Sequence, residues 1–595
     1  MIIEYITLAV YLGVLLFLGA YFKKFTTNLS DFVRGGGQGS WWLIGTSMLM
    51  SSISAFTFTG NASAAFEAGP SLLVIYLANC MGFLFGGLFL GPWLRQTRAY
   101  TTADVIRLRY GVPVEQLGAC FGVLLGPVTA AIQLYALSLF ASTVLGLPLI
   151  PTMVTIAIIV TFYSTSGGKW AVMATDFVQA VIMLPITVLV CVLSLQAAGG
   201  VSGFISFFME PSVQADFTFI KESGEFPGDR YTLKWAIIVF IMQTTSQLSL
   251  TSTSRYVSAR DGKEAARASW LSLVLMSIGS AVWFIPPMVA RFLYSDEILA
   301  SGVANPANSS YAFIAIKLLP NGLLGLLIAA MFAATMSSMD TGLNAQVGVL
   351  VRNIIPRFRG FLGFSAPLDM KAEMRICHIA SICFGCLILA GALCFTLQKE
   401  IGLFDASLIV SSVVGIPMAF PLFVGLWLKR LPKWSYFPIF FACLGPSVWS
   451  FIDGSINGVE WTIQDRAMWI FIFGSVTTLG CLLLSRFNTA DSQHEVEEFF
   501  NLMHTPIDYE KEIGSAKVDY EQHFALAKST LAVAILVMLI LFLPNTLVAR
   551  LYILAIAASV LTVSGLLLWG GIRIRSRQAR LQNAPYPETP HNPEC

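Results

Sequence analysis

The sequence predicts an all-α polytopic membrane protein with about fifteen transmembrane helices. Of its 595 residues, 56% are hydrophobic and only 12% are charged, and the mean hydropathy is +0.73. An ordinary soluble domain carries roughly a quarter charged residues, so this composition excludes that class. Runs of about 20 apolar residues, each long enough to cross a bilayer, occur at 4–22, 40–66, 70–94, 117–145, 149–165, 170–199, 233–256, 268–293, 320–351, 375–397, 402–428, 435–452, 467–486, 526–543 and 547–573.

Basic residues in alternate loops predict how these spans are oriented. Clusters of Lys and Arg follow the spans that end at 22, 94, 256, 351, 428 and 573, whereas the loops between are short or acidic. Cytoplasmic loops are the ones enriched in Lys and Arg. We therefore expect a plasma-membrane protein with its N-terminus outside and its C-terminus in the cytoplasm. The net charge of +2 is spread over short loops, so the expected surroundings are the lipid bilayer and not nucleic acid.

The stretch 322–344, GLLGLLIAAMFAATMSSMDTGLN, begins as an apolar helix and ends in small and hydroxyl residues. Ala334, Ser337 and Ser338 fall at i, i+3 and i+4, so they share one helical face. Polar atoms at membrane depth need a partner, a cavity or an ion. Two hydroxyls and a freed backbone carbonyl suit a monovalent cation that must bind and also leave. The alternative is that these small residues only allow helices to approach closely.

Two further spans carry dense polar residues. From Gly45 the chain reads GTSMLMSSISAFTFTGNASAAFEAG, which predicts a discontinuous helix whose backbone lines a cavity. The alternative is a packed helix whose serines bond to their own backbone. In the span 233–256, residues 243–247 (QTTSQ) form a polar belt that is too dense for lipid contact.

An acidic residue lies within the apolar run 170–199. We expect Gly167 and Gly168 to make the turn before this span, which places Asp176 two helical turns inside it, at roughly 10 Å. An intramembrane carboxylate is a functional candidate by default. The alternative is that Asp176 caps or pairs with a neighbouring helix.

The remaining segments do not indicate an enzyme. Residues 487–525 are polar and read as a cytoplasmic linker or regulatory insert, and the tail after Arg573 reads as disordered. No kinase, nucleotide-binding or zinc-protease motif is present, and the five histidines lie nearly all in loops or in the tail. A membrane enzyme would need nucleophile, base or metal clusters at membrane depth, so we expect no catalytic residues.

Three motifs resemble the sodium:solute symporter family, which includes the sodium/glucose, sodium/proline, sodium/pantothenate and sodium/sialic acid transporters. The first is Gly167-Gly168 with Ala171-Val172 and Thr175-Asp176-x-x-Gln179. The second is SRYVSARD at 254–261 with Glu264-Ala265, and the third is AATMSSMD at 333–340 with Asn344. The motifs occur in order and on the expected sides of the membrane, and the resemblance runs from the first span to about residue 428.

The resemblance implies a leucine-transporter-type core of two inverted five-helix repeats with additional peripheral helices. The expected organisation is a first span and loop at 1–38, a first repeat at 39–199, an extracellular loop at 200–232, a second repeat at 233–428, peripheral spans at 429–486, a cytoplasmic linker at 487–525, two further spans at 526–573 and a tail at 574–595.

The resemblance also implies sodium-coupled import by alternating access. The implied sodium site takes the backbone carbonyls of Met50, Ile53 and Ala334 and the hydroxyls of Ser337 and Ser338. Asp176 matches the family's aspartate near this site, which is a ligand in members that use a second sodium ion. Whether one or two ions bind stays open.

The solute site implied by the resemblance lies at the midplane of the membrane. Its polar candidates are Ser52, Thr57, Asn79, Gln243, Thr244, Thr245 and Gln247. Thr245 falls near the place where sugar transporters carry a gating tyrosine, so the sugar site is not simply inherited.

No Arg or Lys is placed here, and a buried anion without a cationic partner is costly, although helix N-termini can partly substitute. We therefore expect a neutral hydroxylated solute such as a sugar. The alternatives are an amino acid or carboxylate such as proline or sialic acid, or a sensor that binds solute without moving it.

Overall fold

The computed structural model describes residues 2–22, 29–210, 217–300, 305–363, 368–397, 403–459, 461–487, 489–512 and 519–582. Within these residues the protein is all-helical, and its only extended pairings are two isolated bridges, Gly39 with Ala259 and Lys221 with Thr232. The chain divides into two compact units, Met1–Tyr509 and Glu510–Cys595. The predicted all-α fold is confirmed.

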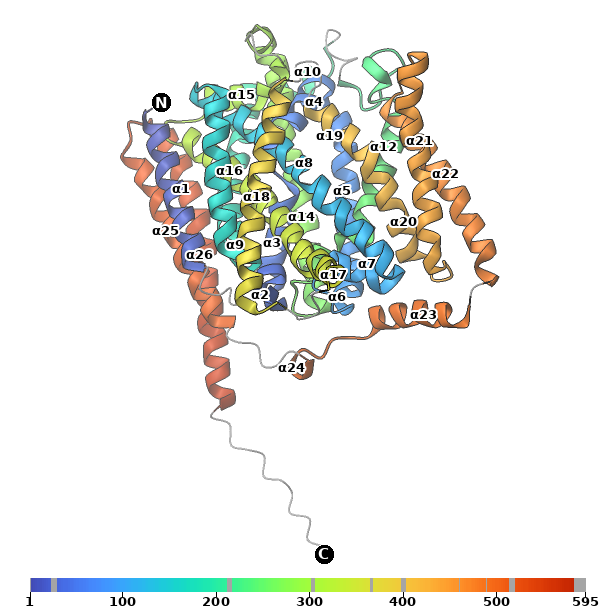
Figure 1. Cartoon of the computed structure of the whole chain (residues 1–595). Coiled ribbons are helices and arrows are strands. Elements are labelled where there is room, and N and C mark those ends of the chain that lie inside the picture. Colours follow the sequence, from blue (N-terminus) through green and yellow to red (C-terminus); the bar gives the residue numbers. More distant parts are fainter. Residues whose placement is uncertain are drawn as a thin grey trace, which may run out of the picture. The chain divides into compact units, whose positions relative to one another are not determined.

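The first unit contains most of the helices (Figure 1). It begins with α1 (Ile2–Phe22), α2 (Leu29–Arg34), η2 (Gly35–Gly37), α3 (Trp41–Ser52), η3 (Ala55–Phe58), α4 (Gly60–Ala68), η4 (Gly69–Leu72), α5 (Leu73–Phe85), η5 (Gly86–Leu90), α6 (Gly91–Gln96), α7 (Thr102–Tyr110), α8 (Val112–Leu145) and α9 (Leu149–Ala197). It continues with α10 (Gly200–Phe207), η6 (Pro227–Asp229), α12 (Leu233–Gln247), η7 (Leu250–Ser252), α13 (Thr253–Tyr256), α14 (Gly262–Leu299), η8 (Pro306–Ser309), α15 (Ser310–Leu318), α16 (Leu323–Val349), η9 (Leu350–Ile354), α17 (Ile355–Phe361), α18 (Met370–Leu397), α19 (Leu403–Val410), η10 (Ser411–Gly415) and α20 (Ile416–Trp427). Peripheral elements follow: η11 (Lys433–Ser435), α21 (Tyr436–Asn457), α22 (Ile463–Leu484), η12 (Ser485–Phe487) and α23 (Ala490–His504), with α24 (Tyr509–Glu512) at the boundary of the units.

The second unit is a helical hairpin of α25 (Asp519–Leu539) and α26 (Leu547–Gln582), which are joined through η13 (Ile540–Phe542). The two helices pack along each other, and the Ser564 hydroxyl donates to the Ala527 carbonyl at 2.8 Å. The tail predicted as disordered from residue 574 is helical as far as Gln582, because α26 continues past its apolar span, and residues 583–595 lie outside the described part of the chain.

Among the described residues, eleven helices are long and apolar enough to cross a membrane, and they follow the predicted spans from residue 112 onward closely. The structure has fewer such helices than the fifteen predicted spans because some of the spans are short or interrupted. The predicted spans 4–22 and 149–165 contain the shorter apolar helices Glu4–Val14 and Leu149–Phe162. The spans predicted at 40–66 and 233–256 are broken into α3 and α4 and into α12 and α13.

Helix α9 corrects one expected boundary. The turn expected at Gly167 and Gly168 is absent, since α9 is assigned as one helix over 49 residues. A glycine pair costs only about 1 kcal/mol per residue in a helix interior. The apolar residues on both sides can therefore carry the helix through it.

The helix α16 occupies the centre of the first unit. It packs against α1, α3, α8 and α9, and almost all of its apolar stretch is buried, whereas most of the apolar stretch of α22 is not. The polar face of α16 therefore meets protein and not lipid. This placement positions the functional site.

A carboxylate from α1 caps the first turn of α16. Glu4 is 5% exposed, and its carboxylate accepts hydrogen bonds from the backbone N–H groups of Gly322, at 2.6 Å, and of Gly325. Unpaired N–H groups and the helix dipole both favour an anion at this end. A Cβ on Gly325 would lie 2.6 Å from the Glu4 carbonyl oxygen, so the close approach of α1 depends on that glycine.

Replacing Glu4 with alanine should destabilise the folded protein by about 1.5–3 kcal/mol, the range for hydrogen bonds to a charged group. The measurement is thermal unfolding of the purified protein in detergent. Glu297→Ala is the matched control, because Glu297 is an exposed partner of Lys317 and such pairs contribute about 0–1 kcal/mol. Equal melting temperatures for the two variants would contradict this capping role.

Candidate functional site

The predicted break in the first repeat is present between α3 and η3. Ile53 (φ −124°, ψ 149°) and Ser54 (φ −155°, ψ −178°) are extended, so the regular hydrogen bonding of α3 stops here, and the Met50 carbonyl accepts from the Ile53 N–H at 3.4 Å instead. On the other side of the break, the backbone N–H of Ala55 donates to the Thr335 hydroxyl of α16 at 2.7 Å. The break is thus held open by a side chain from the central helix.

Thr335→Val should destabilise the protein by about 1–3 kcal/mol, because it leaves the buried Ala55 N–H without an acceptor while conserving shape. The measurement is the melting temperature with and without sodium. Thr187→Val is the control, since Thr187 is also fully buried but bonds only within its own helix. The prediction is wrong if both valine variants melt alike.

Backbone carbonyls from the break converge on Ser338. Its hydroxyl lies 3.3 Å from the Met50 carbonyl oxygen, 2.7 Å from that of Ile53 and 3.2 Å from that of Ala334. The Ser51 carbonyl, which the sequence reasoning did not include, lies at 3.4 Å. One hydroxyl proton cannot satisfy four acceptors. The cluster therefore concentrates neutral oxygens, the ligand type with which unwound carbonyls in transporters coordinate Na⁺.

Ser337 points to a different partner from Ser338. Its hydroxyl is buried and faces the Asp176 carboxyl without a hydrogen bond of normal geometry. Asp176 is fully buried, and its Oδ2 accepts from the Ser47 hydroxyl at 2.5 Å. Within the described residues, Oδ1 of Asp176 has no hydrogen-bond partner. The structure therefore brings four of the five predicted oxygens together and places the fifth beside the carboxylate.

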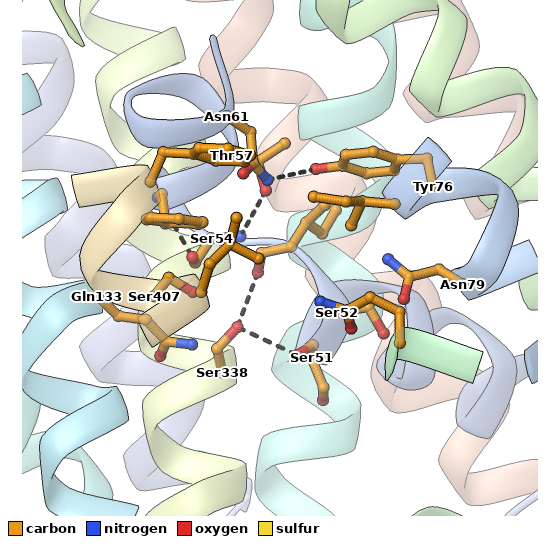
Figure 2. A pocket seen from close by; sticks show the side chains of 16 residues that line it. Ser51, Ser52, Ser54, Thr57, Asn61, Tyr76, Asn79, Gln133, Ser338 and Ser407 are labelled. Atoms are coloured by element: carbon orange, nitrogen blue, oxygen red, sulfur yellow. Dashed lines mark hydrogen bonds between the residues drawn. The ribbon is translucent and has the colours of Figure 1, made fainter. Parts of the chain in front are cut away.

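A cavity of about 170 Å³ adjoins the carbonyl cluster (Figure 2). Figure 2 shows Gln133 and Ser407 on one side, Tyr76 and Asn79 on the other, and Ser338 below. The sixteen lining side chains, all among the described residues, include no Asp, Glu, Lys, Arg or His. They are Ser51, Ser52, Ile53, Ser54, Phe56, Thr57, Asn61, Ile75, Tyr76, Asn79, Gln133, Gln243, Ser338, Phe404, Ser407 and Leu408. The cavity is smaller than the 300–1,000 Å³ typical of sites for drug-sized ligands and suits a small polar solute.

Part of the predicted solute set lines this cavity: Ser52, Thr57, Asn79 and Gln243. Thr244 and Thr245 do not, because successive residues on α12 point in directions about 100° apart. Gln247 does not line the cavity either, although it lies one turn beyond Gln243 on the same face of the helix. The side-chain amide of Gln247 instead donates to Oδ1 of Asn79 at 3.1 Å. It therefore orients a residue that does line the cavity.

Several lining residues were missed by the sequence reasoning, among them Gln133, Tyr76, Asn61 and Ser407. Asn61 donates to the Tyr76 hydroxyl at 2.8 Å, which fixes both groups at the cavity wall. Of these residues, Gln133 could have been predicted from the sequence. It is an amide inside the apolar run 117–145, and polar residues within membrane spans are functional candidates. Ser407 carried no such signal.

Comparison with known proteins identifies the family. The family model described as sodium:solute symporter family matches residues 32–434. The chain belongs to the sodium:solute symporter family. It is therefore a sodium-coupled, multi-pass membrane transporter, and sodium is its coupling ion.

Among curated relatives, this symporter is 25% identical over 434 residues to the sodium/sialic acid symporter SiaT of Proteus mirabilis, covering 72% of this chain and 85% of the relative. It is 22% identical over 513 residues to the sodium/sialic acid symporter NanT of Aliivibrio fischeri, covering 83% and 95%. It is 26% identical over 353 residues to the sodium/myo-inositol cotransporter 2 of Sus scrofa, covering 54% and 52%.

The fold is similar to that of a solved Na⁺-coupled sialic acid symporter in a substrate-bound outward-open state. The TM-score is 0.67 at 18% sequence identity, and the match covers 82% of this chain and 98% of the other. The symporter therefore has the leucine-transporter-type fold, and the predicted fold class is confirmed.

Proposed function

We propose that this symporter imports a small polyhydroxylated solute together with sodium across the plasma membrane, with sialic acid or a related acidic sugar as the first candidate. Coupling between sodium and solute is supported by residues that belong both to the cavity wall and to the carbonyl cluster. Ser51, Ile53 and Ser338 line the cavity, and the same residues supply oxygens to the carbonyl cluster. An ion in the cluster would lie beside a solute in the cavity, so each would favour the binding of the other.

We assign the proposed sodium site to the carbonyls of Met50, Ile53 and Ala334 with the hydroxyls of Ser337 and Ser338. The unbonded Asp176 oxygen beside Ser337 supports a second cation position there. The proposed solute site consists of Ser52, Thr57, Asn79 and Gln243, with Thr244, Thr245 and Gln247 as the polar surroundings on α12.

The transport cycle follows from this arrangement. With the N-terminus outside, sodium enters the cluster from the exterior, the solute enters the cavity, and both leave toward the cytoplasm after the repeats rock. Coupled ligands typically raise each other's affinity by about 1–3 kcal/mol. The membrane potential adds about 2.3 kcal/mol per charge for each 100 mV.

Sialic acid is the first candidate because the two bacterial relatives are named as its sodium symporters. The names of these relatives favour an acidic sugar over the neutral sugar that the sequence led us to expect. The hydroxyl and amide lining of the cavity suits the solute's hydroxyls, but no cationic side chain lines the cavity. A carboxylate there would take the neighbouring sodium ion as its counter-charge, since an unpaired buried anion is costly. Binding of sialic acid should then depend on sodium more strongly than binding of a neutral analogue.

A neutral polyol is the second candidate. The uncharged lining favours it directly, and the pig relative is named as a myo-inositol cotransporter. For such a solute, sodium would order the wall of the cavity without contacting a charge.

The deciding experiment is uptake into proteoliposomes of labelled sialic acid, myo-inositol, glucose and proline. Each solute is tested with inward sodium, potassium and proton gradients. We expect sialic acid to accumulate with sodium only. Accumulation of myo-inositol alone would replace the first candidate by the second. Binding of a solute to the purified protein without accumulation under any gradient would make the protein a sensor.

A further inference from the structure

A second cavity lies at the end of the helices that the charge pattern predicts to be cytoplasmic. It measures about 480 Å³ and is bounded by the loop after α20, by η12 after α22 and by α23. Its lining residues are Lys429, Arg430, Leu431, Ser485, Arg486, Gln493, Val496 and Glu497. This cavity is separate from the sodium and solute sites, because its lining shares no residue with them.

Charge in this cavity favours an anion that also carries a donor group. Three cationic side chains, Lys429, Arg430 and Arg486, share the lining with one carboxylate, Glu497. A phosphate would be attracted to the three cations. The carboxylate would repel a bare anion, but it would accept a hydrogen bond from an ammonium or hydroxyl group attached to that anion.

The cavity lies at the boundary between hydrocarbon and water. Leu483 and Leu484, which end α22 directly before η12, are 73% and 51% exposed. Trp434 is also exposed, and Trp is enriched at membrane interfaces. These exposed apolar side chains need lipid tails as their solvent. Lipid headgroups therefore lie at the depth of the cavity.

The helix α23 forms the wall of the cavity on the water side. Figure 1 shows α23 lying across the ends of the membrane helices at the bottom of the view. Its apolar face, Val496, Phe499, Phe500 and Met503, is buried, and it packs against α6 and α7. Lys433 pairs with Glu495, which ties α23 to the loop after α20. Glu497, two residues further along α23, lines the same cavity as the basic residues.

We propose that this cavity binds the headgroup of a membrane phospholipid, with the phosphate against Lys429, Arg430 and Arg486 and an ammonium or hydroxyl group against Glu497. The bound lipid joins the ends of α20 and α22 to α23. A free phosphate shares the anionic chemistry but lacks both the donor group and the acyl chains.

The test counts lipids bound to the purified protein by native mass spectrometry and measures its melting temperature with each added lipid. The probes are phosphatidylethanolamine and phosphatidylglycerol, which carry donor groups, phosphatidylcholine, which does not, and inorganic phosphate. We expect the first two to be retained and to raise the melting temperature. Equal effects of phosphatidylcholine, or of inorganic phosphate alone, would overturn the proposal.

Matched variants locate the effect. K429Q/R430Q/R486Q should weaken binding on the order of 100-fold, since each basic residue near a lipid surface contributes about fivefold. The control K263Q/K371Q/R375Q removes three exposed basic residues that do not line this cavity and should bind as the wild type does. E497Q should reduce the preference for donor-carrying lipids. If the first variant retains lipid as the control does, the proposal is wrong. Neither readout requires transport, so failure here is distinct from failure of the proposed symport.

Discussion

Ser338→Ala should raise the sodium concentration needed for half-maximal uptake by about 10- to 100-fold, equivalent to the 1.5–3 kcal/mol of one contact to a charged group. The hydroxyl is the only side-chain oxygen in the carbonyl cluster, and it lies 2.7 Å from the Ile53 carbonyl oxygen. Its loss would remove a ligand of the proposed sodium site and would leave the carbonyls of the break without this hydrogen-bond donor. Solute specificity should change less than the sodium requirement.

Sodium-dependent uptake at graded sodium concentrations measures this effect, together with sodium-dependent thermal stabilisation. Ser338→Thr keeps the hydroxyl and should retain most of the affinity. Ser337→Ala should also raise the sodium requirement, but by less, because Ser337 lies beside Asp176 and outside the cluster. Ser381→Ala is the control, since the buried Ser381 hydroxyl bonds within its own helix. Unchanged uptake by Ser338→Ala at saturating and limiting sodium would refute the site assignment.

Gln133→Leu should raise the KM for the solute about tenfold, within the 1–3 kcal/mol cost of leaving a solute hydroxyl unpaired. Gln133 reaches the cavity from α8, opposite Tyr76 and Asn79 (Figure 2). Among the described residues, no hydrogen bond joins its side chain to Ser338 or to the carbonyl cluster. Sodium binding in the absence of solute should therefore stay at the wild-type level.

Uptake kinetics with the identified solute and sodium binding to the empty protein separate these two effects. Thr129→Val, one turn away on α8 at an exposed position, is the control. A parallel loss of sodium binding and solute binding in Gln133→Leu would indicate general misfolding. An unchanged KM would remove Gln133 from the solute site.

The membrane spans were predictable because bilayer thickness sets the length of an apolar run, and the family resemblance supplied their arrangement. The break after Ser52 was also predictable, since a run of serines in an apolar helix has no favourable contact with lipid. The convergence of Met50, Ile53 and Ala334 on Ser338 agrees with the implied site.

The cavity wall was less predictable because it depends on which faces of distant helices meet. Gln133, Tyr76 and Ser407 come from α8, α5 and α19, and nothing in one helix's periodicity shows the rotation of another. Conversely, Thr245 belongs to a polar belt and still lies away from the cavity, because only one face of α12 reaches it. The continuity of α9 was likewise not predictable from its glycine pair alone, because glycines are tolerated inside helices at a modest cost.

The bond between Glu4 and the first turn of α16 has a practical consequence. The carboxylate sits in the opening turn of α1, outside the segment 32–434 that carries the family match. A tag or partner protein fused ahead of α1 would act on the turn that caps the central helix, roughly three to four helical turns from Ser337 and Ser338 of the proposed sodium site. Fusions for imaging or purification should therefore be placed elsewhere. A truncated core that starts at residue 32 should lose sodium affinity even though every residue of the proposed sodium site is retained.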